Sequence, residues 1–151
     1  MEKERAFPHI RPELFKQVWQ ALKKGEKGSD SRWSYMAKSI ETHKEFIPFL
    51  EGKQKTLPPG APDPFLHLTL HTVVEELLAE NELPEIGYFY DIQKKHGLSH
   101  HEIVHMLGAI LTTQLFTIFK EQKFDIEFYK QILKEYAHYT PDVFWKKIEE
   151  G

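Results

Sequence analysis

The sequence predicts an all-α fold, a single-domain bundle of about six to seven helices. Three observations support this prediction. Apolar residues recur every three to four positions along most of the chain, helix-starting residues precede these repeats, and no strand-like alternation of apolar and polar residues is found. A chain of 151 residues is long enough for one compact domain, which we expect to span 1–151.

The first two predicted helices are amphipathic. Residues 12–24 carry an apolar stripe, and Pro12 occupies a favourable first-turn position. A second helix should follow the polar loop 25–31 and continue until Pro48 breaks it, with His43 on its apolar face.

A long proline-rich loop, residues 51–63, is expected between the second and third helices. Asp63 before Pro64 is a typical N-terminal cap, so the third helix should run from Pro64 to about Glu82. Ser99 and Asp125 are caps of the same kind, and Gly97 is a left-handed helix stop. The remaining helices are predicted over residues 84–96, 99–119, 125–136 and 140–148.

Composition narrows the classes of function. The net charge of -3 and the scattering of basic residues among acidic ones argue against nucleic-acid binding. Without cysteine, disulfides, thiolate nucleophiles and cysteine-ligated metals are excluded. No apolar run of about 18 residues exists and the N-terminus is highly charged, so we expect a cytoplasmic protein without a membrane association.

Histidine is the residue type that stands out, with nine copies in the chain. His67 and His71 share one predicted helix, and His101 and His105 share another. Each spacing of four places two imidazoles on one helical face, about 6 Å apart at their Cβ atoms, within reach of one ion. These two pairs predict a metal site of four nitrogens. Among metals, zinc or iron is favoured.

Further ligands can be nominated around these pairs. His43 arrives from the second helix, and Glu75 and Glu76 follow the first pair along the third helix. We expect these three side chains to be additional ligands or to hydrogen-bond the ligands from outside.

Glu102 lies between the histidines of the second pair, in the pattern His-Glu-x-x-His that zinc hydrolases use, where the glutamate is the general base. It also stands three residues after Ser99, where a glutamate commonly caps the helix start. The sequence favours the capping role and leaves Glu102 as the candidate catalytic residue. Leu111 occupies the position of the third histidine in the extended protease motif, which argues against a protease.

The motifs together resemble a family of uncharacterised bacterial proteins, domain of unknown function 1841. The resemblance depends on Asp63-Pro64-Phe65-Leu66-His67-x-x-x-His71, Glu76 and His101-Glu102-x-x-His105, within residues 11–119. Asp63 replaces an asparagine of the family pattern, and Ala109 and Thr113 stand where acidic residues are expected. The resemblance implies a cytoplasmic helical protein with no known activity, followed by a helical extension over 124–150.

Three functions therefore stay open. The first is a protein that binds a transition metal through the two histidine pairs, without an assigned reaction. The second is a metal-free helical interaction module or homo-oligomer whose histidines are structural. The third is a metal-dependent hydrolase that uses His-Glu-x-x-His. The sequence leaves open whether the protein is an enzyme, and it identifies no partner.

Overall fold

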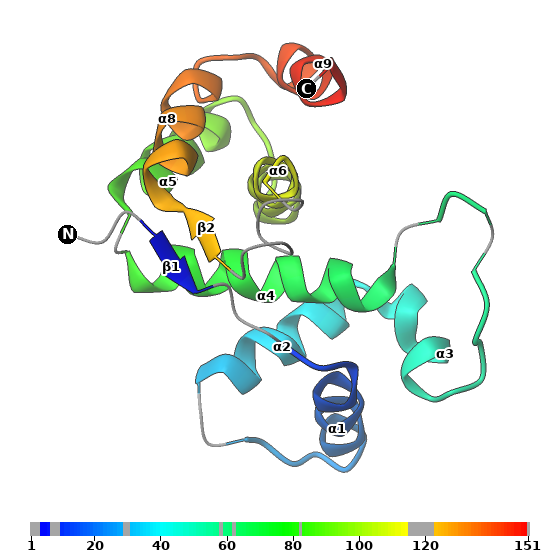
Figure 1. Cartoon of the computed structure of the whole chain (residues 1–151). Coiled ribbons are helices and arrows are strands. Elements are labelled where there is room, and N and C mark those ends of the chain that lie inside the picture. The colour runs from blue at the N-terminus through cyan, green and yellow to red at the C-terminus, as the bar shows by residue number, and fades with distance from the viewer. Residues whose placement is uncertain are drawn as a thin grey trace. The chain divides into compact units, whose positions relative to one another are not determined.

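The computed structural model describes residues 4–6, 10–28, 31–57, 59–61, 63–81, 83–114 and 123–150. Helices dominate these residues (Figure 1), which confirms the predicted all-α class. They are α1 (Pro12–Lys23), α2 (Ser31–Thr42), the 3-10 helix η1 (Lys44–Phe46), α3 (Ile47–Leu50), α4 (Pro64–Glu80), α5 (Pro84–Lys95), α6 (His100–Thr112), α8 (Ile126–Tyr136) and α9 (Pro141–Glu150).

Contacts divide the chain into two compact units. One, the N-terminal unit, comprises His9–Glu76. The other, the C-terminal unit, comprises Met1–Pro8 and Leu77–Gly151. The extent of a single domain over 1–151 stays a prediction.

The N-terminal unit has its own apolar core, in which α1 packs against α2. Within the apolar stripe predicted for the first helix, Phe15 is fully buried and Val18 nearly so, whereas Leu14 is 41% exposed. Burial of this kind is the main stabilising contribution to a small helical unit. The buried core residues are Ile10, Phe15, Val18, Met36, Ala37, Ile40, Leu50 and Leu68.

The second helix ends earlier than predicted. It stops at Thr42, His43 leaves the helical region with φ -130° and ψ 60°, and η1 and α3 follow. The prediction that Pro48 breaks this helix is therefore wrong. Pro48 instead occupies the first turn of α3, where the missing backbone N–H costs no intrahelical hydrogen bond.

Predicted helix ends are confirmed at four positions. The side chains of Asp63, Ser99 and Asp125 each accept a hydrogen bond from a backbone N–H of the first turn. Gly97 adopts a φ of 87° after α5, the left-handed conformation that a glycine permits without a Cβ clash. Capping residues thus position the starts of α4, α6 and α8.

The C-terminal unit is built from α5, α6, α8 and α9 around buried aromatic side chains. The rings of Phe89 and Phe144 meet with their centroids 5.9 Å apart. Tyr129 is fully buried and donates its hydroxyl proton to the carbonyl of Leu107 over 3.3 Å, which joins α8 to α6. Burial raises the pKa of the Tyr129 hydroxyl above its usual value.

Two short strands differ from the strand-free prediction. β1 (Glu4–Ala6) and β2 (Lys123–Asp125) pair antiparallel, with Glu4 opposite Asp125 (Figure 1). Three residues are too few for an alternating pattern to be visible in a sequence, which is why the sequence did not predict this pair of strands. The helix predicted over residues 99–119 is α6, which ends at Thr112. Residues 115–119 of the predicted range lie outside the described part of the chain.

Candidate metal centre

Three histidines of the N-terminal unit come together where α2 meets α4. His67 and His71 lie one turn apart on α4, so their rings share one face of that helix. His43 directly follows the last residue of α2. Ser39 of α2 and Thr72 of α4 are hydrogen-bonded through their side-chain oxygens over 3.2 Å, and this buried contact holds the end of α2 against α4.

Two ion pairs strengthen the same helix packing. Arg32 binds both carboxylate oxygens of Glu76, with separations of 2.5 and 3.2 Å, and Lys38 lies 3.3 Å from Glu75. Both glutamates are buried, with 6% and 8% of their surfaces exposed for Glu76 and Glu75. A buried carboxylate requires such a partner. The structure therefore places these predicted additional ligands in ion pairs between α2 and α4.

The three rings approach one another with their Nε2 atoms. The Nε2 of His43 lies 2.9 Å from that of His71 and 3.0 Å from that of His67, and the Nε2 atoms of His67 and His71 are 3.2 Å apart. We refer to His43, His67 and His71 as the histidine triad. Its three Nε2 atoms form a nearly equilateral triangle.

Hydrogen bonding alone does not account for this triangle. Each Nε2 either carries a proton and donates, or carries a lone pair and accepts. Among three atoms at least two must be of the same kind, so at least one edge sets two protons or two lone pairs against each other. A cation at the centre removes the conflict, because all three nitrogens then present lone pairs to it.

The distances match those expected around one ion. Imidazole nitrogens bound at about 2.1 Å with right-angled ligand directions lie about 3.0 Å apart, and tetrahedral directions give about 3.4 Å. Ring centroids then lie about 4.5 Å apart for right angles. The observed centroid separations are 4.3, 4.5 and 4.8 Å. The triad thus has the shape of three ligands on one face of an octahedral ion.

Neighbouring side chains hold the ring of His43 in place. His43 and His71 are buried, and His67 is partly exposed. Phe46 stacks on His43 with ring centroids 5.3 Å apart and an interplanar angle of 17°. On the other edge of the ring, the Nδ1 of His43 lies 2.8 Å from Oε2 of Glu45.

Glu45 was not among the residues nominated from the sequence. The sequence does contain a signal for this contact, because an acidic residue two positions after a histidine can form a hydrogen bond with the imidazole within one turn. Burial raises the pKa of Glu45, but the hydrogen bond from His43 and the charges of His43 and His67 outweigh it, so the pKa lies below its usual value. The carboxylate is therefore ionised at neutral pH, and in this form it can accept a hydrogen bond but cannot donate one.

The second predicted pair belongs to the C-terminal unit. His101 and His105 lie on one face of α6, as their spacing predicted, with ring centroids 4.3 Å apart. Glu102 is exposed, and its backbone N–H donates to the hydroxyl of Ser99 over 3.1 Å, so Ser99 is the N-cap of α6, while the capping role of the Glu102 side chain stays a prediction. That both pairs bind one ion, and that Glu102 has a catalytic role, stay predictions.

A comparison with known families follows from these motifs. The family described as Domain of unknown function (DUF1841) matches residues 9–135, which include both histidine pairs and His43. The chain belongs to this family. The match continues beyond residue 119, where we expected the resemblance to end, and takes in most of α8. No curated protein and no solved structure matches the chain.

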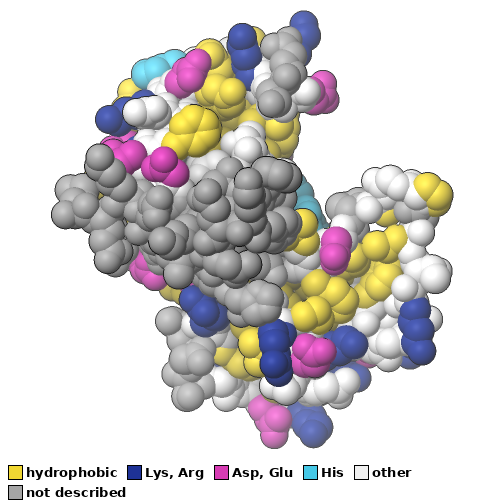
Figure 2. Space-filling model, in the orientation of Figure 1, with side chains coloured by type: hydrophobic (Ala, Val, Ile, Leu, Met, Phe, Trp, Pro, Cys, Tyr) yellow, Lys and Arg dark blue, Asp and Glu magenta, His cyan; other side chains and the backbone are white. Residues whose placement is uncertain are grey.

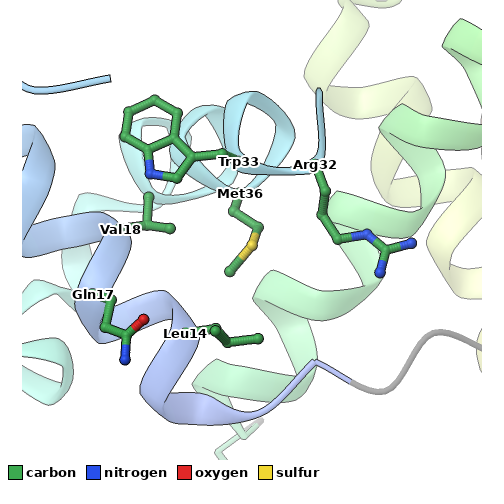
Figure 3. A pocket seen from close by; sticks show the side chains of 6 residues that line it. All are labelled: Leu14, Gln17, Val18, Arg32, Trp33 and Met36. Carbon is green, nitrogen blue, oxygen red and sulfur yellow. The ribbon is translucent and has the colours of Figure 1, made fainter. Parts of the chain in front are cut away.

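This DUF1841 member also has a cavity of about 230 Å³ in its N-terminal unit, between α1 and α2. Figure 3 shows Leu14 and Met36 directed into it, while the side chain of Arg32 extends away from them, in keeping with its ion pair to Glu76. The cavity is smaller than the about 300–1,000 Å³ of most small-molecule sites. It shares no lining residue with the histidine triad.

Charged side chains of both signs are interspersed among the described residues on the face drawn in Figure 2. In Figure 2, lysine and arginine side chains alternate with aspartate and glutamate rather than forming a basic stripe. None of the helices in the described parts of the chain combines the length and the apolar character that a membrane span needs.

Proposed function

We propose that this protein binds one transition-metal ion, zinc or iron, through the Nε2 atoms of His43, His67 and His71. The observation that carries the proposal is the triangle of Nε2 atoms, with all edges between 2.9 and 3.2 Å. Three imidazole nitrogens this close together, brought from two segments of the chain, are an arrangement that suits a metal ion.

The donor atoms favour a transition metal over magnesium or calcium. Magnesium and calcium take oxygen ligands, whereas imidazole suits zinc, iron, nickel and copper. The two nearby carboxylates of Glu75 and Glu76 are engaged with Lys38 and Arg32, so the triad supplies nitrogen alone.

Three protein ligands leave coordination positions for water or for a small ligand. Catalytic zinc sites keep three protein ligands and one open position, whereas structural zinc sites are closed by four. His101 and His105 remain the sequence-predicted sources of further ligands. The proposal covers binding of the ion and does not depend on a reaction.

Metal analysis of protein purified without a histidine tag tests the proposal. We expect about one zinc or iron ion per chain, and replacement of His67 and His71 by alanine should remove it. Exposed histidines outside the triad supply a matched control, because replacement of His96 and His138 by alanine removes the same number of imidazoles.

Circular dichroism should show that each variant keeps its helices, since a variant that unfolds says nothing about ligands. Wild-type protein that binds neither zinc nor iron when these are supplied would contradict the proposal. The metal-free interaction module would then be the better interpretation of the histidines.

A further inference from the structure

The ring of His43 has both of its nitrogens engaged, and the two contacts differ in kind. Nδ1 faces the carboxylate of Glu45 at 2.8 Å, and Nε2 faces the Nε2 atoms of His67 and His71 at 3.0 and 2.9 Å. An ionised carboxylate can only accept a hydrogen bond, so Nδ1 must carry the proton. A neutral His43 then has its lone pair on Nε2.

We infer that Glu45 is a positioning residue, which holds His43 as the Nδ1–H tautomer and directs its Nε2 lone pair at the metal. The inference deepens the proposed metal site and rests on it for its effect on affinity. A carboxylate behind a ligating histidine is a frequent companion of metal sites, because it selects the tautomer and orients the ring.

The local backbone makes this contact easy to form. His43 precedes η1, and the N–H of Phe46 donates to the carbonyl of His43 over 3.0 Å, so the chain turns sharply after the histidine. This turn returns the side chain of Glu45 to the His43 ring. Phe46 stacks on the face of the same ring. One short turn thus controls both the rotation and the tautomer of His43.

The solvent exposure of the Glu45 side chain argues that its role is to position His43 and not to stabilise the fold. The side chain of Glu45 is 62% exposed, whereas that of His43 is 7% exposed. An exposed side chain can be truncated with little effect on stability. Loss of Glu45 should therefore change the chemistry of His43 and leave the fold intact.

The experiment compares Glu45→Ala with Glu41→Ala. Glu41 is also an exposed glutamate two residues from His43, on α2, so its replacement makes the same change in charge. Glu45→Gln is the conservative variant, since its amide oxygen can still accept the Nδ1 proton. Two readouts are needed: zinc affinity in competition with a chelator, and the His43 tautomer from ¹⁵N NMR of the metal-free protein.

We expect Glu45→Ala to lower zinc affinity by about 10- to 100-fold and to remove the Nδ1–H tautomer. Glu45→Gln should retain part of the zinc affinity and part of the Nδ1–H tautomer. Glu41→Ala should match the wild type in both properties. If the wild type binds zinc and Glu45→Ala changes neither the affinity nor the tautomer, the inference is overturned while the metal site stands. If the wild type binds no zinc but Glu45→Ala alters the tautomer, the metal site fails and the positioning role of Glu45 is retained.

Discussion

The histidine triad and the pair formed by His101 and His105 begin from the same local geometry. In each, two histidines four residues apart bring their rings together, with centroids 4.8 Å apart for His67 and His71 and 4.3 Å apart for the second pair. The triad then gains a third ring, because α2 packs on α4 and ends one residue before His43. Helical spacing brings two rings together, and packing between segments of one unit adds the third.

The largest effect is expected when the two α4 histidines and the two α6 histidines are replaced in separate variants and their metal contents are compared. His67→Ala with His71→Ala should reduce metal content from about one ion per chain to less than about a tenth. His101→Ala with His105→Ala should weaken binding and leave a bound ion, because the triad is retained. Metal analysis and competition titration provide the measurement. If replacement of His101 and His105 removed the ion while replacement of His67 and His71 left it bound, the second pair and not the triad would be the metal site.

Acid should release the metal steeply. A histidine binds a metal only when neutral, so protons compete with the ion as the pH falls through about 6.5, and three imidazoles compete together. We expect full occupancy near pH 8 and loss by pH 5. Undiminished occupancy at pH 5 would mean that carboxylates rather than the triad dominate the site.

Stability and metal content together distinguish the two roles considered for Glu102, helix capping and a role at a metal site. Ser99→Ala should lower the free energy of unfolding by about 1 kcal/mol, since it removes the side-chain acceptor at the start of α6. Glu102→Gln should change stability by less than about 0.5 kcal/mol and leave metal content unaltered. Denaturant unfolding and metal analysis test both. A folded Glu102→Gln variant without metal would make Glu102 a ligand or a base.

A smaller effect concerns acid stability of the N-terminal unit. Hydrogen bonds from Trp19, Lys23 and Lys53 lower the pKa of Glu51 to about 2. A lowered carboxyl pKa contributes stability above the unfolded value of about 4.5, and the contribution disappears as the pH falls through about 2. In metal-free protein, wild type should therefore be more stable than Glu51→Gln at pH 7, with the difference shrinking toward pH 2. A difference independent of pH would show that the Glu51 charge is not its source.

The part of the site that could be predicted is the part encoded along single helices. The spacing of four correctly predicted that the rings of His67 and His71, and those of His101 and His105, lie together on one helical face, and the cap Asp63 marks the start of α4 as predicted. The junction of His43 with α4 could not be predicted in detail, because it depends on the early end of α2 and on the packing of Ser39 against Thr72. Glu45 stands two residues after His43, a spacing visible in the sequence, but its hydrogen bond depends on the turn that η1 forms after His43.

X-ray absorption of the zinc-loaded protein tests the central claim most directly, because it reports ligand type and distance around the ion itself. We predict at least three imidazole nitrogens at about 2.1 Å. Replacing His67 and His71 by alanine should remove this imidazole signal. A wild-type spectrum dominated by oxygen ligands, or one left unchanged by these two substitutions, would contradict a metal site at the histidine triad.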